Sequence, residues 1–218
     1  MINIIKNPWL DVYKSDLVRG AYFSYYYEFP LLEKSNYIPK KLIPFDKAKK
    51  TLDKHQWVHF YIHDYRFQCI WNNPKQYLNI LQQYEGVIIP DFSLYRDLPL
   101  AMQIWNTYRN RAIGYWLQSQ GIKIIPNIRW GDERTYEFAF EGLEKGGTVA
   151  ISTYGCIKNK TDRTFFQNGL EKMVQLLAPD TIVVYSYSPD KIFLPYKQAG
   201  INIVAFDNYV DMLRKAMN

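Results

Sequence analysis

The chain has 218 residues, with 27 Lys and Arg against 21 Asp and Glu, and a formal net charge of +6. A hydrophobic fraction of 48% suffices for a folded core and excludes a disordered protein. No apolar run approaches the ~20 residues that span a bilayer, and the first residues lack the features of a signal peptide. We therefore expect a soluble, intracellular protein with no membrane partner, whose positive charge mildly favours anionic partners.

The first 40 residues are aromatic over residues 22–27 and show no clean periodicity. We interpret residues 1–40 as an N-terminal cap segment of the same domain, and residues 41–218 as one α/β domain. A chain of this length fits a single domain of that kind.

Seven short apolar runs follow the cap segment, and the last six begin 20 to 36 residues apart, the length of a strand–helix unit. Continuous apolar strands separated by amphipathic helices are typical of a parallel sheet covered on both faces. The runs are Leu42–Phe45, Val58–Ile62, Gly86–Ile89, Lys123–Ile125, Thr148–Ile151, Thr181–Val184 and Ile201–Val204.

The stretches between these runs carry helix signals. Asp97 is a predicted N-cap for a helix that begins at residue 98 and ends at Gly121. Asp132 is a predicted N-cap for a helix over residues 132–145. Further helices are predicted over residues 162–179 and, more briefly, from residues 188 and 208.

Polar side chains follow every apolar run rather than only two of them. Ligands and catalytic groups lie at the carboxyl ends of strands in alternating β/α folds. The pattern favours parallel strands in a TIM-barrel-like, possibly incomplete, arrangement. The alternative is an open doubly wound sheet.

Asp91 and Arg129 are the strongest candidates for a functional site. Asp91 ends a strand, where a carboxylate can act as a general base or hold a cation. Asn127 and Arg129 share a face of the next strand, and an arginine there can bind phosphate through two hydrogen bonds. The alternative is that Arg129 pairs with Asp91 or Glu133 in a structural ion pair.

His63 and Asp64 form the second candidate pair, because a neighbouring carboxylate raises the pKa of a histidine toward neutrality. His59 lies earlier in the same strand and is interpreted as a hydrogen-bonded core residue. A site that uses Asp91 and Asp207 predicts binding of Mg²⁺.

The remaining candidates follow the later strands and contribute to ligand binding. The predicted catalytic residues are Asp91, His63 and Asp64, and the predicted ligand-binding residues are Asn127, Arg129, Glu133, Ser152, Tyr154 and Ser186. Basic residues in the loop after the fifth run, Lys158, Lys160 and Arg163, form a solvated face or contact a phosphate backbone while aromatic residues stack on bases.

Four sequence blocks together resemble a known family: 89–93 (IPDFS), 104–111 (IWNTYRNR), 129–133 (RWGDE) and 152–156 (STYGC). The family is the domain of unknown function number 4417, which phages and mobile elements encode. The resemblance covers roughly residues 40–208 and leaves the first 40 residues outside. It implies a phage, plasmid or integrative-element setting, hence the cytoplasm of a host cell, and it transfers no catalytic residues.

Two functions remain open from the sequence. The first is binding or hydrolysis of a phosphorylated ligand, a nucleotide or nucleic acid, at the carboxyl-end mouth, with a metal-dependent phosphoester hydrolase as the enzyme class. The alternative is a non-catalytic protein that acts on a host or phage protein. A DNA-binding accessory role rests on the basic runs alone, because no DNA-binding motif is evident.

Overall fold

The computed structural model describes residues 12–217 and contains seven strands. Every predicted apolar run overlaps one of them, and all the ladders between them are parallel. The strands are β1 (Leu42–Pro44), β2 (Trp57–His59), β3 (Gly86–Ile88), β4 (Ile124–Ile125), β5 (Thr148–Ser152), β6 (Thr181–Tyr185) and β7 (Asn202–Phe206). The predicted α/β class with parallel strands is therefore confirmed.

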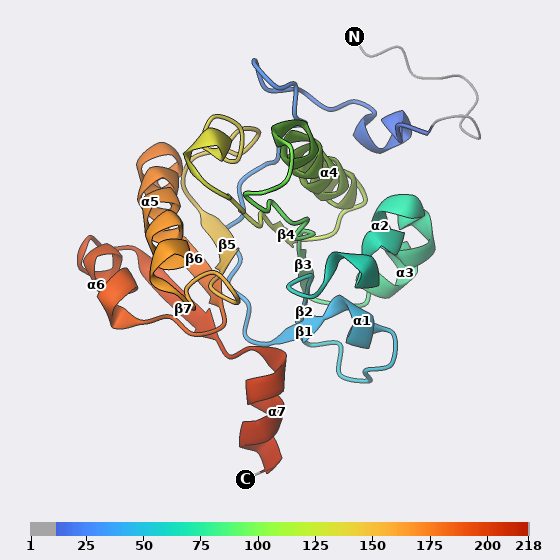
Figure 1. Cartoon of the computed structure of the whole chain (residues 1–218). Helices are drawn as coiled ribbons and strands as arrows, with labels where there is room; N and C mark the ends of the chain where they lie inside the picture. The colour runs from blue at the N-terminus through green and yellow to red at the C-terminus, as the bar shows by residue number, and fades with distance from the viewer. Residues whose placement is uncertain (1–11, 218) are drawn as a thin grey trace.

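The strands form two sheets, ordered β1-β2-β3-β4 and β5-β6-β7. Backbone hydrogen bonds link the sheets just beyond β4: Ile128 N–H donates to Ala150 O (2.9 Å), and Ala150 N–H donates to Pro126 O (2.8 Å). The seven strands thus follow one another in chain order, with β1 and β7 at the outer edges (Figure 1). Within residues 12–217 these two edges form no ladder with each other.

Helices alternate with the strands, and the two longest, α4 and α5, lie beside β4 and β5 (Figure 1). The helix α7 at the C-terminal end projects away from the sheets. The helices are α1 (Phe45–Ala48), α2 (Gln68–Asn72), α3 (Leu78–Leu81), α4 (Leu100–Ser119), α5 (Lys160–Leu177), α6 (Asp190–Gln198) and α7 (Tyr209–Met217). Short 3-10 turns cover Ser15–Val18, Asp64–Arg66, Pro74–Tyr77 and Glu133–Thr135. No helix within residues 12–217 has the length and apolar character needed to cross a membrane.

Two helix predictions differ from the structure. The helix α4 begins at Leu100 with Pro99 as its N-cap, rather than at residue 98 with Asp97 as its N-cap. The predicted helix over residues 132–145 is wrong, because only the turn Glu133–Thr135 is helical there. Arg111 binds the carbonyl oxygens of Ala139 and Glu141. Those carbonyls would otherwise accept hydrogen bonds within a helix.

Side chains from all seven strands contribute to one apolar layer between the inner faces of the two sheets. Trp57 lies flat against β3, where Gly86 leaves room for its ring; a Cβ at this position would lie 2.5 Å from it. Phe206 of β7 packs against the buried members of this layer, which are Leu42, Trp57, Tyr61, Ile88, Ile125, Ala150, Val183 and Tyr185.

The segment 12–40 packs onto the outer core that covers β1–β4. Leu17, Val18 and Leu32 are buried in the same cluster as Val58 and Val87. The interpretation of residues 1–40 as a cap remains a prediction, and residues 1–11 lie outside the described part of the chain.

Buried polar side chains on α4 hold the loops around it. Asn106 donates to Ser93 O (2.6 Å), and Asn110 donates to Pro90 O (2.6 Å). Arg111, which is 2% exposed, donates to Ala139 O (2.7 Å) and Glu141 O (3.0 Å) and also pairs with the Asn110 side chain. Buried polar groups must be hydrogen-bonded. This face of α4 therefore fixes the loop after β3 in one position.

Replacing Asn110 with leucine tests this role of α4. The variant Asn110→Leu leaves the Pro90 carbonyl and one N–H group of Arg111 without partners. We expect a loss of about 2–4 kcal/mol in the free energy of unfolding, measured by urea denaturation. Asn168→Leu on the exposed face of α5 is the matched control and should change stability by less than about 0.5 kcal/mol. Equal effects of the two substitutions would contradict this role.

Candidate functional site

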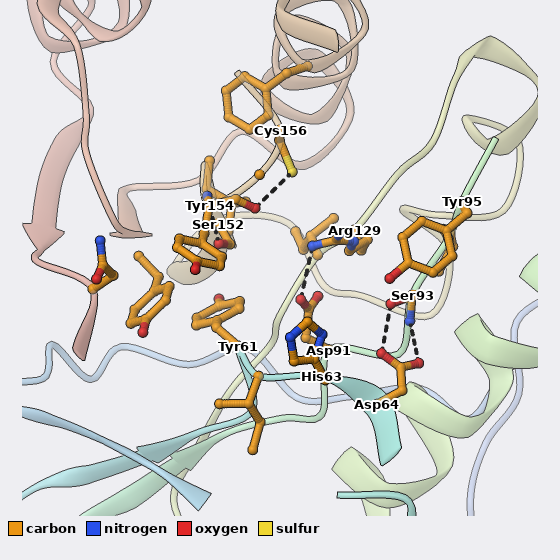
Figure 2. A pocket seen from close by; sticks show the side chains of 18 of the residues that line it. Tyr61, His63, Asp64, Asp91, Ser93, Tyr95, Arg129, Ser152, Tyr154 and Cys156 are labelled. Carbon is orange, nitrogen blue, oxygen red and sulfur yellow. Dashed lines mark hydrogen bonds and ion pairs between the residues drawn. The ribbon is translucent and has the colours of Figure 1, made fainter. Parts of the chain in front are cut away.

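A cleft of about 590 Å³ opens at the carboxyl ends of the strands (Figure 2). Loops that follow strands of both sheets contribute side chains to it. Six of the predicted site residues line the cleft: His63, Asp64, Asp91, Arg129, Ser152 and Tyr154. The prediction that the strand ends gather polar groups at one edge is therefore confirmed for these residues.

Asp91 is the centre of a buried hydrogen-bond network in this cleft, and its side chain is only 9% exposed. The side-chain amide of Asn127 donates to Asp91 Oδ1 (2.9 Å), and Arg129 Nη1 donates to Asp91 Oδ2 (3.0 Å). The hydroxyl of Tyr61 donates to Asn127 Oδ1 (2.9 Å). Residues from the ends of β2, β3 and β4 thus hold one carboxylate.

The electrostatics of Asp91 reflect its burial and its partners. Burial raises the pKa of Asp91 above its usual value, while the charge of Arg129 and the hydrogen bond from Asn127 oppose that rise. Asp91 in turn raises the pKa of Arg129. The two groups form the structural ion pair that the sequence left open as an alternative.

This ion pair does not use all of the Arg129 guanidinium. Only Nη1 bonds to Asp91, and the side chain is 23% exposed at the wall of the cleft. Within residues 12–217, Nε and Nη2 of Arg129 have no hydrogen-bond partner. A positively charged guanidinium with two unused donor nitrogens therefore lies at the wall of the cleft.

His63 and Asp64 both line the cleft, but their side chains have different partners. Asp64 accepts hydrogen bonds from the hydroxyl of Ser93 (2.7 Å) and from its backbone N–H (3.1 Å). The ring of His63 is exposed and stacks on Tyr65, with 5.8 Å between ring centroids. Asp64 therefore holds the loop after β3 through Ser93, while the His63 ring is held against Tyr65.

Aromatic rings form the floor of the cleft. Tyr61 and Tyr185 stack with 4.7 Å between centroids, and the ring of His59 lies 4.5 Å from Tyr185. His59 is 1% exposed, and its Nδ1 accepts a hydrogen bond from Tyr61 N–H (3.1 Å). Burial lowers the pKa of His59 to about 3, so the ring is neutral at physiological pH. The interpretation of His59 as a hydrogen-bonded core residue is confirmed.

Ser152 and Cys156, at the end of β5 and in the loop after it, also line the cleft. Neither has the features of a nucleophile. The Ser152 hydroxyl accepts a hydrogen bond from Tyr154 N–H (3.1 Å), which closes a local turn. Burial raises the pKa of the Cys156 thiol, although Arg129 opposes the rise. A thiol with a raised pKa is mostly protonated at neutral pH and is a poor nucleophile.

Four predicted site residues lie outside the cleft lining, and three of them do not bond to Asp91. Glu133 is exposed in a 3-10 turn. Ser186 is buried with a φ of 80°, and its N–H donates to Phe206 O (2.8 Å). Asp207 pairs with Lys215 (2.7 Å) and does not join Asp91. Within residues 12–217, no group of three or more His, Cys, Asp or Glu side chains is arranged to hold a metal ion.

Asn127 also lies outside the cleft lining, but it supports the site from beneath. It is 1% exposed and bonds to both Asp91 and Tyr61. Asn127 and Arg129 are two residues apart, so the sequence predicted that their side chains share one face of the strand. Both side chains bond to Asp91.

Two ion pairs at the mouth of the cleft escaped the sequence analysis. Arg66 pairs with Asp46 (2.8 Å), and Arg96 pairs with Asp162. Arg96 also lies over the ring of Phe165, at 4.3 Å from its centroid. Arg96 and Asp162 are far apart in the chain and share no periodic pattern. Asp46 directly follows the first apolar run, but nothing in the sequence pairs it with Arg66.

Comparison with known proteins shows which family the chain belongs to. A family model described as "Domain of unknown function (DUF4417)" matches residues 21–207. The prediction that the resemblance leaves out the first 40 residues is therefore wrong for residues 21–40. No solved structure matches the chain.

Two curated relatives are phage proteins, which agrees with the predicted setting. The "Gene 1 protein" of Mycobacterium phage D29 is 35% identical over an alignment of 167 residues, and the match covers 73% of this chain and 60% of the relative. The "Gene 1 protein" of Mycobacterium phage L5 is 34% identical over 162 residues, 73% of this chain and 71% of the relative. This chain thus spans less than two thirds of the D29 protein.

The Asp91–Arg129 ion pair predicts a characteristic pattern of stability changes. Asp91→Asn leaves the charge of Arg129 without its counter-ion, so we expect a loss of about 3 kcal/mol in urea denaturation at pH 7. The double variant Asp91→Asn/Arg129→Gln should recover part of this loss, because no charge is left unpaired.

Asp190→Asn is the control, because Asp190 forms an exposed ion pair with Lys197 (2.8 Å). Exposed pairs contribute about 0–1 kcal/mol. A double variant less stable than Asp91→Asn alone would show that the charge of Arg129 is not what destabilises the single variant.

Proposed function

The chain belongs to the DUF4417 family, and we propose that its carboxyl-end cleft binds a phosphorylated ligand. The observation that carries the proposal is the arrangement of Arg129, which Asp91 holds through Nη1 while Nε and Nη2 remain available. An arginine oriented in this way can bind phosphate oxygens through two parallel hydrogen bonds. Because the ion pair fixes the guanidinium in advance, less conformational freedom is lost when the ligand binds.

The aromatic floor supports the same proposal. The stacked rings of Tyr61 and Tyr185 and the half-exposed ring of Tyr154 offer flat apolar surfaces at the cleft. A nucleotide combines a phosphate with a planar base that stacks on such rings. A nucleotide, free or within a nucleic acid, therefore fits the combination of Arg129 and the tyrosines.

We also propose that the seven strands form an incomplete TIM-barrel-like structure with its mouth at this cleft. The sequential order of the parallel strands and the backbone bonds from β4 to β5 support a continuous curved sheet. The apolar layer supports it as well, because side chains from every strand meet there. Such interior layers are typical of (β/α) barrels.

The arrangement of acidic groups favours binding over hydrolysis. Asp91 is occupied by Asn127 and Arg129, and Asp207 lies outside the cleft lining. A carboxylate neutralised by an arginine is a weak general base and a poor ligand for Mg²⁺. The proposal therefore assigns Asp91 to the positioning of Arg129.

Isothermal titration with inorganic phosphate and thymidine monophosphate tests the proposal. We expect both to bind the wild-type protein. Arg129→Gln should weaken each by about 10-fold or more, because it removes a charge-assisted pair of hydrogen bonds. Arg129→Lys keeps the charge but loses the two parallel N–H donors of the guanidinium, so it should retain only part of the affinity.

Arg134→Gln is the matched control, because Arg134 follows the same strand and also pairs with an aspartate, Asp132 (2.8 Å), outside the cleft lining. Its affinities should equal those of the wild type. Wild-type protein that binds neither probe, or equal losses in Arg129→Gln and Arg134→Gln, would refute the proposal. Urea denaturation of each variant separates lost binding from lost folding.

A further inference from the structure

Four exposed tyrosines surround the cleft. They are Tyr65, Tyr95, Tyr154 and Tyr187, with exposed fractions of 75%, 55%, 54% and 73%. We call them the rim tyrosines, and in residues 41–217 they are the tyrosines with large exposed side chains.

Each rim tyrosine belongs to a loop that follows a different strand. Tyr65 follows β2, Tyr95 follows β3, Tyr154 follows β5 and Tyr187 follows β6. The strands are parallel and succeed one another in chain order, so these loops all lie at the edge that contains the cleft. Single exposed aromatic residues are common on protein surfaces. Four that share one edge indicate a binding surface.

Contacts with neighbouring side chains hold two of the rim tyrosines in place. The ring of Tyr65 stacks on His63, and its hydroxyl accepts a hydrogen bond from Arg66 Nε (3.2 Å). The ring of Tyr154 meets that of Tyr185 edge to face, with 6.5 Å between centroids. Both side chains are largely exposed, so these held rings can contact a ligand at little further cost in conformational entropy.

Basic residues accompany the rim tyrosine of the β5 loop. Lys158, Lys160 and Arg163 are exposed within nine residues of Tyr154. The acidic residue among them, Asp162, already pairs with Arg96 across the cleft. This part of the rim therefore carries a net positive charge beside an exposed ring.

We infer that the cleft and its rim bind a single strand of nucleic acid, so that the phosphorylated ligand is a nucleotide within a chain. The inference rests on the proposed function, because Arg129 would bind one phosphate of that strand. Tyrosines interleaved with basic residues are typical of surfaces that bind single strands, where bases stack on the rings. Duplex DNA does not suit this surface, since its bases are already stacked and paired.

Fluorescence anisotropy tests the inference with two labelled oligonucleotides, each ten nucleotides long: oligothymidylate (DNA) and oligouridylate (RNA). The test variant is Tyr65→Leu/Tyr187→Leu, because neither residue lines the cleft and thymidine monophosphate binding should persist. We expect at least one strand to bind more tightly than the mononucleotide. The double variant should weaken strand binding by about 10-fold or more.

Two further variants isolate the role of the rings. Tyr25→Leu/Tyr26→Leu is the matched control, because these tyrosines are 88% and 82% exposed in the N-terminal segment, outside the cleft lining; it should bind like the wild type. Tyr65→Phe/Tyr187→Phe keeps both rings and should retain most of the affinity. The two strands, of DNA and RNA type, show which sugar is preferred, and binding of either one supports the inference.

The outcomes separate this inference from the proposed function. If thymidine monophosphate binds through Arg129 but neither strand binds more tightly, the inference fails and the proposed function stands. The same holds if the rim and control variants bind strands equally well. If neither the mononucleotide nor either strand binds the wild type, both proposals fail. A ten-base-pair duplex that binds more tightly than either strand would also overturn the inference.

Discussion

The site depends on one buried ion pair, between Asp91 after β3 and Arg129 after β4. An ionised carboxylate that is 9% exposed is costly unless charged or polar partners surround it. Asp91 meets this requirement with Arg129 and Asn127, and Asn127 is held in turn by Tyr61. The same bonds that satisfy Asp91 join the ends of three strands and set the direction of the Arg129 guanidinium.

The helix α4 extends this constraint to the surrounding loops. Its buried amide groups bind the carbonyl oxygens of Pro90 and Ser93, on either side of the Asp91 side chain. Ser93 then donates two hydrogen bonds to Asp64, so the loops after β2 and β3 are tied together. A helix that buries amides and arginines in place of a fully apolar face therefore supports the functional edge of the sheet.

The strand pattern was readable from the sequence because buried parallel strands are continuous apolar runs. Asp91, Asn127 and Arg129 were also identifiable, since each follows such a run and the last two share a strand face. The failures have physical causes. The stretch 132–145 has the apolar spacing of a helix. However, Arg111 donates hydrogen bonds to two backbone carbonyl oxygens of this stretch, which are then not used within a helix. Glu133, Ser186 and Asp207 also follow strands, but local turns and partners direct them away from the cleft.

The ion pair between Arg96 and Asp162 had no sequence signal. Arg96 and Asp162 meet across the cleft only because the loops after β3 and β5 lie at the same edge. The rim tyrosines were individually visible in an aromatic-rich chain, but the strand order was needed to bring them to one surface. Local periodicity therefore identified the strands and helices. The residues that meet at the mouth of the cleft could be identified only from the three-dimensional structure.

The central claim is that Asp91 holds Arg129 in position for a phosphate group. A crystal structure of the protein with bound thymidine monophosphate tests it most directly. We expect a phosphate oxygen within hydrogen-bond distance of Arg129 Nε or Nη2, while Nη1 remains bonded to Asp91 as it is in the free protein. A phosphate bound elsewhere in the cleft with Arg129 unengaged, or an Arg129 that leaves Asp91 to reach it, would contradict the account.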